Sequence, residues 1–99
     1  MRVNTESLHF SADEKLLIYI QQRIEKLTQF FDKIIDANVT LKLENSGQVK
    51  EKVVEVKINV PGDVLFIKET NKSFEHAIDK AVDSLKRQLI KYKERLRNH

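Results

Sequence analysis

Basic side chains are concentrated near the carboxyl-terminal end of this 99-residue chain. Residues 86–99 contain six lysines or arginines and one acidic residue, so this segment carries a formal charge of +5. Residues 1–85 contain 12 basic and 14 acidic side chains and carry a net charge of −2. Because a phosphate backbone responds to local potential more than to total charge, this segregation indicates a surface that binds a polyanion. An alternative reason is that lysine and arginine near a helix C-terminus complement the helix dipole.

The spacing of these basic residues places them on two sides of one predicted helix. Ser73 is the expected N-cap, and an apolar stripe with steps of three or four residues continues for about 23 residues. The stripe consists of Phe74, Ile78, Ala81, Leu85, Leu89, Tyr92 and Leu96. With this stripe facing a core, one flank carries Lys80, Arg87, Lys91 and Arg95, and the opposite flank carries Lys86, Lys93 and Arg97. Like charges four residues apart destabilise an isolated helix, so a polyanionic partner explains the two rows better than stability does.

Residue types that support catalysis or metal binding are sparse. The chain has no cysteine, and its histidines His9, His76 and His99 belong to no metal-ligand pattern. Asp79 and Asp83 lie one turn apart near a helix N-terminus, where carboxylates complement the dipole. No glycine-rich loop is present to bind a nucleotide. We therefore predict no catalytic site, no metal site and no cofactor, and an enzyme is the least favoured class of function.

Hydrophobic periodicity predicts the elements that position the basic helix. Residues 1–8 give a weak strand pattern, and Ser11 and Glu14 have the spacing of a capping box before an apolar helical stripe over residues 12–32. Alternating segments then predict strands at 39–43, 54–60 and 64–68, with turn residues at 45–47 and 61–63. The order β-α-β-β-β-α predicts a single α+β domain over residues 1–99, with two helices packed on one face of a four-stranded sheet.

Overall composition limits the class of protein. Apolar residues make up 40% of the chain and charged residues 33%, which is enough for one modest core. The longest uncharged apolar run, Leu16–Ile20, is far shorter than the ~20 residues of a membrane span. No secretory signal opens the chain, so we expect a cytoplasmic protein with no membrane partner. The predicted strands expose Thr40, Lys42, Lys57 and Asn59 rather than aromatic side chains, which argues against base stacking on the sheet.

Segments of both predicted helices match a known pattern. The last helix contains Ala77-Ile78-Asp79, Arg87-Gln88-Leu89 and Lys91-Tyr92-Lys93, and the first contains Tyr19-Ile20 and Phe31-Asp32. These segments resemble the family of ribosome hibernation promoting factor and the ribosome-associated inhibitor. The resemblance implies a fold similar to double-stranded RNA-binding domains, and a protein that binds the small ribosomal subunit in stress or stationary phase. It also implies that the protein occupies the channel of mRNA and of the A- and P-site tRNAs. Because the chain ends at His99, it resembles the short form.

The predicted RNA-contacting residues combine this resemblance with the two flanks of the last helix. The basic residues of the family map by position onto Arg23, Lys26, Lys86, Arg87, Lys91, Lys93 and Arg95, and helical spacing adds Lys80. We predict a non-enzymatic translation inhibitor that binds the small ribosomal subunit and its rRNA, is monomeric when free, and has no small-molecule substrate. Two alternatives use the same surface: a general double-stranded RNA-binding module without ribosome specificity, and a domain that binds an acidic protein.

Overall fold

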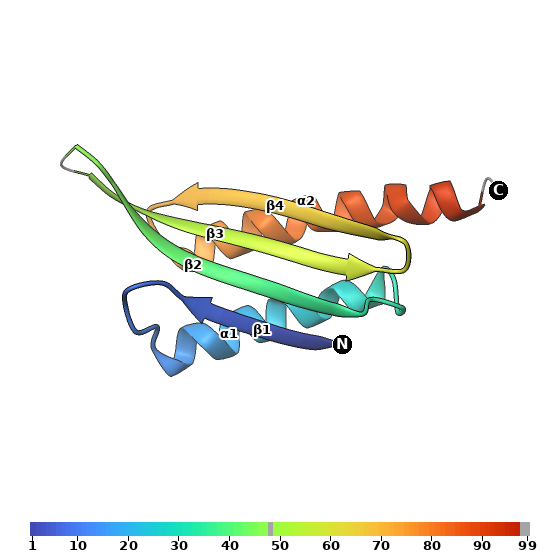
Figure 1. The fold of residues 1–99 in the computed structure, drawn as a ribbon, viewed down its shortest axis with the longest axis horizontal. Helices are drawn as coiled ribbons and strands as arrows, with labels where there is room; N and C mark the ends of the chain where they lie inside the picture. Colours follow the sequence, from blue (N-terminus) through green and yellow to red (C-terminus); the bar gives the residue numbers. More distant parts are fainter. Residues whose placement is uncertain (48, 98–99) are drawn as a thin grey trace.

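The computed structural model describes residues 1–47 and 49–97 and contains four strands and two long helices (Figure 1). The elements are β1 (Arg2–Ser7), α1 (Glu14–Glu25), the 3₁₀ helix η1 (Lys26–Gln29), β2 (Asp36–Ser46), β3 (Val49–Val60), β4 (Asp63–Asn71) and α2 (Phe74–Arg97). This is the predicted β-α-β-β-β-α order of an α+β domain. Within the described residues, no helix is both long enough and apolar enough to cross a membrane.

The sheet is mixed, with the strand order β1-β2-β3-β4. β1 pairs with β2 in parallel, with Thr5 opposite Val39, whereas the β2–β3 and β3–β4 pairs are antiparallel. A parallel pair requires a crossover connection, and α1 supplies it. α1 lies beside α2 on one face of the sheet (Figure 1), so the predicted single layer of helices on a four-stranded sheet is confirmed.

Alternation along the strands places one apolar row beneath the helices. Val54, Val56 and Ile58 of β3 are fully buried, whereas Lys57 points to the open face. The helices contribute the fully buried side chains Ile20, Ile24, Ile78, Leu85 and Leu89. These residues belong to one core cluster, and burial of their apolar surface is the main stabilising contribution. Burial of this stripe determines which side chains of each helix remain available to a partner.

Asp13 rather than Ser11 is the N-cap of α1. Its Oδ1 accepts a hydrogen bond from the Leu16 backbone N–H at 2.8 Å, so the predicted capping box is wrong. The segment before the helix is held by packing, because the Phe10 ring stacks on Phe74 with 5.4 Å between centroids. The capping-box spacing thus placed the N-cap of the helix two residues too early.

The first helix also ends earlier than the predicted boundary at residue 32. α1 ends at Glu25, and η1 follows, in which the Thr28 hydroxyl donates to the Glu25 carbonyl oxygen at 2.8 Å. A hydroxyl bonded to a backbone carbonyl competes with helical hydrogen bonding. Phe31 and Ile34 continue the apolar stripe in sequence and are buried, but they lie beyond η1. The periodicity therefore identified buried residues correctly and helix length incorrectly.

The C-terminal end of α2 and the β2–β3 hairpin both extend beyond the region where helices and sheet pack together (Figure 1). Tyr92 is buried, its hydroxyl donates to the Pro61 carbonyl oxygen, and its ring meets Phe31 edge-on at 5.2 Å between centroids. Leu96, one turn later, is 51% exposed because the end of α2 runs past the sheet (Figure 1). The prediction that Leu96 faces the core is wrong. At the opposite end the β2–β3 hairpin extends past the helices, which leaves Leu43 45% exposed.

The open face of the sheet carries an aromatic side chain that the sequence interpretation missed. Phe66 of β4 lies opposite Lys57 of β3 and is 53% exposed. Its neighbour Leu65 is buried, so Phe66 follows the normal alternation onto the open face. The prediction that the strands expose no aromatic side chain is therefore wrong.

Candidate nucleic-acid interface

The basic residues of α2 lie on opposite sides of its buried stripe. One row faces the edge strand β4, since Arg95 Nη2 donates to Asp63 Oδ2 at 3.2 Å. This row, the β4 flank, consists of Lys80, Arg87, Lys91 and Arg95. The other row faces α1 and η1, since the Lys86 amine lies 4.9 Å from the ring centroid of Phe30, the residue after η1. This row, the α1 flank, consists of Lys86, Lys93 and Arg97.

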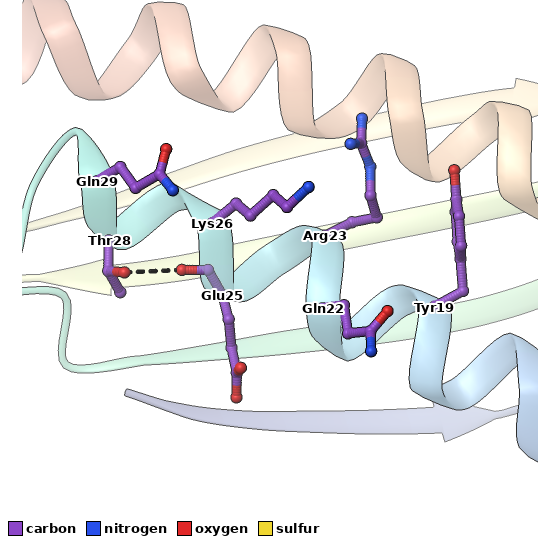
Figure 2. A pocket seen from close by; sticks show the side chains of 7 residues that line it. All are labelled: Tyr19, Gln22, Arg23, Glu25, Lys26, Thr28 and Gln29. Atoms are coloured by element: carbon purple, nitrogen blue, oxygen red, sulfur yellow. Dashed lines mark hydrogen bonds between the residues drawn. The ribbon is translucent and has the colours of Figure 1, made fainter.

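The second of these surfaces gains two basic residues, Arg23 from α1 and Lys26 from the start of η1. Figure 2 shows Arg23 reaching from α1 toward α2, with the Lys26 side chain extending beside it. Both residues border an open hollow of ≈ 590 Å³. The hollow is lined by Tyr19, Gln22, Arg23, Glu25, Lys26, Thr28 and Gln29. Helical spacing alone could not decide whether Arg23 and Lys26 lie near α2, whereas the side-by-side packing of the two helices brings Arg23 against it.

Asp79 joins α1 to α2. Its Oδ1 accepts hydrogen bonds from the Tyr19 hydroxyl at 2.7 Å and from Arg23 Nε at 2.9 Å. The hydrogen bond to this carboxylate is the main cause that raises the pKa of Tyr19, and burial is the second. The phenol therefore keeps the proton that it donates. The sequence interpretation assigned Asp79 only to the helix dipole and missed this contact. Tyr19 and Arg23 are four residues apart and share a helix face, but nothing in the sequence indicates which acidic residue of α2 meets them.

The predicted RNA-contacting residues differ in whether they already have an acidic partner. The ion pairs are Arg23–Asp79 at 2.9 Å, Arg87–Asp83 at 2.8 Å and Arg95–Asp63 at 3.2 Å. The second and third pairs are largely exposed, and such pairs usually contribute about 1 kcal/mol or less. Lys26, Lys80, Lys86, Lys91 and Lys93 form no ion pair with any residue that the structure describes. Their ammonium groups can therefore bind phosphate without losing an acidic partner first.

The histidines do not contribute a metal site in the described part of the chain. His9 and His76 are exposed, and His99 lies outside the described residues. Across residues 1–47 and 49–97, no three histidine, cysteine or acidic side chains are placed to hold an ion together. The ammonium, guanidinium and amide donors of the helical layer are groups that bind phosphate oxygens.

Comparison with known proteins identifies the family of the chain that carries this helical surface. The model of the family described as Sigma 54 modulation protein / S30EA ribosomal protein matches residues 3–97. The chain belongs to this family. The predicted resemblance to ribosome hibernation promoting factors is confirmed, and membership agrees with the prediction of a non-enzymatic protein.

Several bacterial proteins are similar to this S30EA family member along most of its chain. The ribosome hibernation promotion factor of Deinococcus radiodurans is 37% identical over 83 residues, which are 83% of this chain and 44% of that protein. The ribosome hibernation promoting factor of Pseudomonas putida is 30% identical and covers 96% of this chain and 89% of its own length. That of Escherichia coli K12 is 28% identical, with 100% of both chains covered. The chain thus spans less than half of the first relative and nearly all of the other two.

Two solved structures have the same fold as this S30EA family member. The N-terminal domain of Thermus thermophilus Protein Y matches with a TM-score of 0.80 at 22% identity, over 93% of this chain and 99% of that chain. A ribosomal subunit interface protein from Coxiella burnetii matches with a TM-score of 0.83 at 16% identity, over 95% and 99%. At these identities the likeness supports the arrangement of strands and helices.

Proposed function

We propose that this protein is a ribosome hibernation factor that binds the rRNA of the small ribosomal subunit through its helical layer. In this proposal residues 1–99 act as one ribosome-binding domain in the cytoplasm, monomeric when free and without cofactor or small-molecule substrate. The domain occupies the channel of mRNA and of the A- and P-site tRNAs and so inhibits translation when growth stops. Family membership and the names of the relatives support the ribosomal partner.

The observation that carries the proposal is the separation of charge and core on the helical layer. Each helix buries its apolar stripe against the sheet and turns its basic side chains outward. Five of the predicted lysines have no acidic partner among the described residues. The phosphates of an RNA backbone can provide the opposite charge. The molecule measures 50 × 26 × 18 Å, an elongated shape that suits a steric plug in a channel.

This mechanism predicts strong salt dependence of ribosome binding. If about six phosphates are neutralised, the logarithm of the association constant should fall with the logarithm of salt concentration with a slope of about −4 to −5. An acidic protein partner would give a shallower slope, because it lacks the condensed counterions that a nucleic acid releases on binding. Competition with a long RNA duplex separates a general double-stranded RNA binder, which the duplex titrates away, from a ribosome factor, which it leaves bound.

The decisive experiment measures co-sedimentation with ribosomes in extracts from growing and growth-arrested cells. The wild-type protein should travel with the small subunit after growth stops. A Lys86→Ala/Arg87→Ala/Lys91→Ala variant should dissociate at moderate salt. A matched control, Lys57→Ala/Lys68→Ala/Lys72→Ala, removes the same charge from exposed sites on β3, on β4 and before α2, and should remain bound. Equal loss in both variants would reject the helical surface, and absence of wild-type protein from ribosomes would reject the function.

A further inference from the structure

We infer that Asp79 is a positioning residue that holds Arg23 in place to bind an RNA phosphate. This inference rests on the proposed function, because it concerns how the same helical surface recognises rRNA. It assigns a favourable binding role to an acidic side chain within a surface whose partner is an anion.

The contacts of Arg23 leave its phosphate-binding end available. Its Nε donates to Asp79 Oδ1 at 2.9 Å, and this is its only hydrogen bond with the described residues. A guanidinium has five N–H donors, so the four on the terminal nitrogens remain for a ligand. Those two nitrogens form the fork that binds phosphate oxygens in a bidentate manner.

Asp79 is itself fixed from two directions. The Tyr19 hydroxyl donates to the same Oδ1 at 2.7 Å, and both Tyr19 and Arg23 point from α1 toward α2 (Figure 2). Because Tyr19 and Arg23 are one helical turn apart, the carboxylate of the facing helix is held between two donors of one α1 face. A side chain that is ordered before binding loses less conformational entropy on binding.

The Arg23–Asp79 pair is accessible to a ligand, unlike an ion pair buried between two helices. The side chains of Arg23 and Asp79 are 33% and 38% exposed, so the pair lies at the molecular surface. Lys26 extends beside Arg23 (Figure 2), and its ammonium has no ion pair with a described residue. A phosphate bound by Arg23 would therefore meet a second cation nearby.

Asp83 provides a matched comparison one turn further along α2. Its Oδ2 accepts from Arg87 Nη1 at 2.8 Å, but these side chains are 67% and 65% exposed. The pair lies within one helix and connects nothing else among the described residues. Asp83 thus occupies one of the two terminal nitrogens of Arg87, the atoms that bind phosphate oxygens, so it competes with phosphate rather than presenting Arg87 to it.

The test is the direction in which neutralising each aspartate changes affinity for purified small ribosomal subunits. Asp79→Asn should weaken binding by about three- to tenfold, because Arg23 loses its charged anchor. Asp83→Asn should leave affinity unchanged or tighten it, because it removes repulsion from an anionic partner. If Asp79 is only a nearby negative charge, Asp79→Asn will also tighten binding, and that result would overturn the inference.

A double-mutant cycle separates positioning from folding. Arg23→Ala should weaken binding about tenfold, and in that background Asp79→Asn should no longer weaken it. Additive losses would contradict positioning, as would an Arg23→Ala variant that binds like wild type. Because Asp79→Asn could impair folding, thermal unfolding of each variant is measured.

Arg23→Lys tests whether the guanidinium is required while Asp79 is kept. It preserves charge but removes Nε and the fork, and it should lose about as much affinity as Arg23→Ala.

The outcome for the wild-type protein distinguishes the two proposals. Wild-type binding together with tighter binding by Asp79→Asn would reject the role of Asp79 alone. Failure of the wild-type protein to bind small subunits at low salt would reject the proposed function, and the role of Asp79 with it.

Discussion

Tyr19 is held to α2 by a hydrogen bond that depends on its proton. The acceptor is the Asp79 carboxylate at 2.7 Å, and this bond, with burial, raises the pKa of the phenol in the folded protein. The bond stabilises the fold fully below the ordinary tyrosine pKa, which is about 10. As pH rises through the higher pKa of the folded state, the proton is lost and the contribution disappears.

We predict that Tyr19→Phe lowers the free energy of unfolding by about 1 kcal/mol at neutral pH. The difference between wild type and variant should shrink as pH rises above about 10, because both proteins then lack the hydrogen bond. Chemical denaturation at a series of pH values between neutral and strongly alkaline measures this difference. A difference that stays constant over the series would show that the phenolic proton is not what stabilises the contact.

Residue types predicted part of this site, and tertiary contacts determined the rest. Lys86, Lys91 and Lys93 could be assigned from one helical period, because a period fixes which side chains point outward. The link from Arg23 to Asp79 spans 56 positions in sequence, and no periodic signal carries such a pairing. The Lys86–Phe30 contact likewise depends on how α1 and η1 lie against α2.

The periodicity of the sequence predicted the type and order of the elements, whereas packing against neighbouring elements determines where each element ends. The change from helical to alternating periodicity predicted the order of strands and helices, because the two structures bury different positions. Leu96 continues the α2 stripe in sequence but lies beyond the last sheet contact. Phe31 and Ile34 are buried outside any α-helix. Periodicity reports the burial pattern of an element, and it contains no information on how far its neighbour extends.

Leu89 and Leu96, both on the apolar stripe of α2, should respond differently to truncation. Leu89→Ala should lower the free energy of unfolding by about 2–5 kcal/mol, because Leu89 is fully buried and its loss leaves a cavity. Leu96→Ala should change it by about 0.5 kcal/mol or less, as expected for an exposed side chain. Urea denaturation of both variants measures the difference. A large loss in Leu96→Ala would mean that the last turn of α2 is packed in solution.

At the scale of the whole molecule, a modest net charge conceals a strongly divided surface. The formal charge is +3, yet residues 86–99 carry +5 and the remainder carries −2. The fold divides these basic side chains further, because the buried stripe of α2 separates a β4 flank from an α1 flank. The two flanks therefore face in different directions, one toward the edge of the sheet and the other toward α1.

A domain that fills an RNA channel should contact phosphates with both flanks. Lys80→Ala/Lys91→Ala removes two lysines of the β4 flank, and Lys86→Ala/Lys93→Ala removes two of the α1 flank; none has an acidic partner among the described residues. Each pair of substitutions should reduce the steepness of the salt dependence by about 1.5, and the fourfold variant by about twice that, because each lysine contributes roughly one phosphate contact.

The measurement is the affinity for purified small ribosomal subunits over a range of monovalent salt. Lys57→Ala/Lys68→Ala, which removes two charges from the open face of the sheet, should keep the wild-type slope. If the protein instead lies on a single RNA surface, one pair of substitutions will change the slope and the other will not. Since the flanks lie on opposite sides of one helix, a partner that encloses α2 should give equal and additive changes. The salt dependence therefore distinguishes a plug within a channel from a protein bound to an open surface.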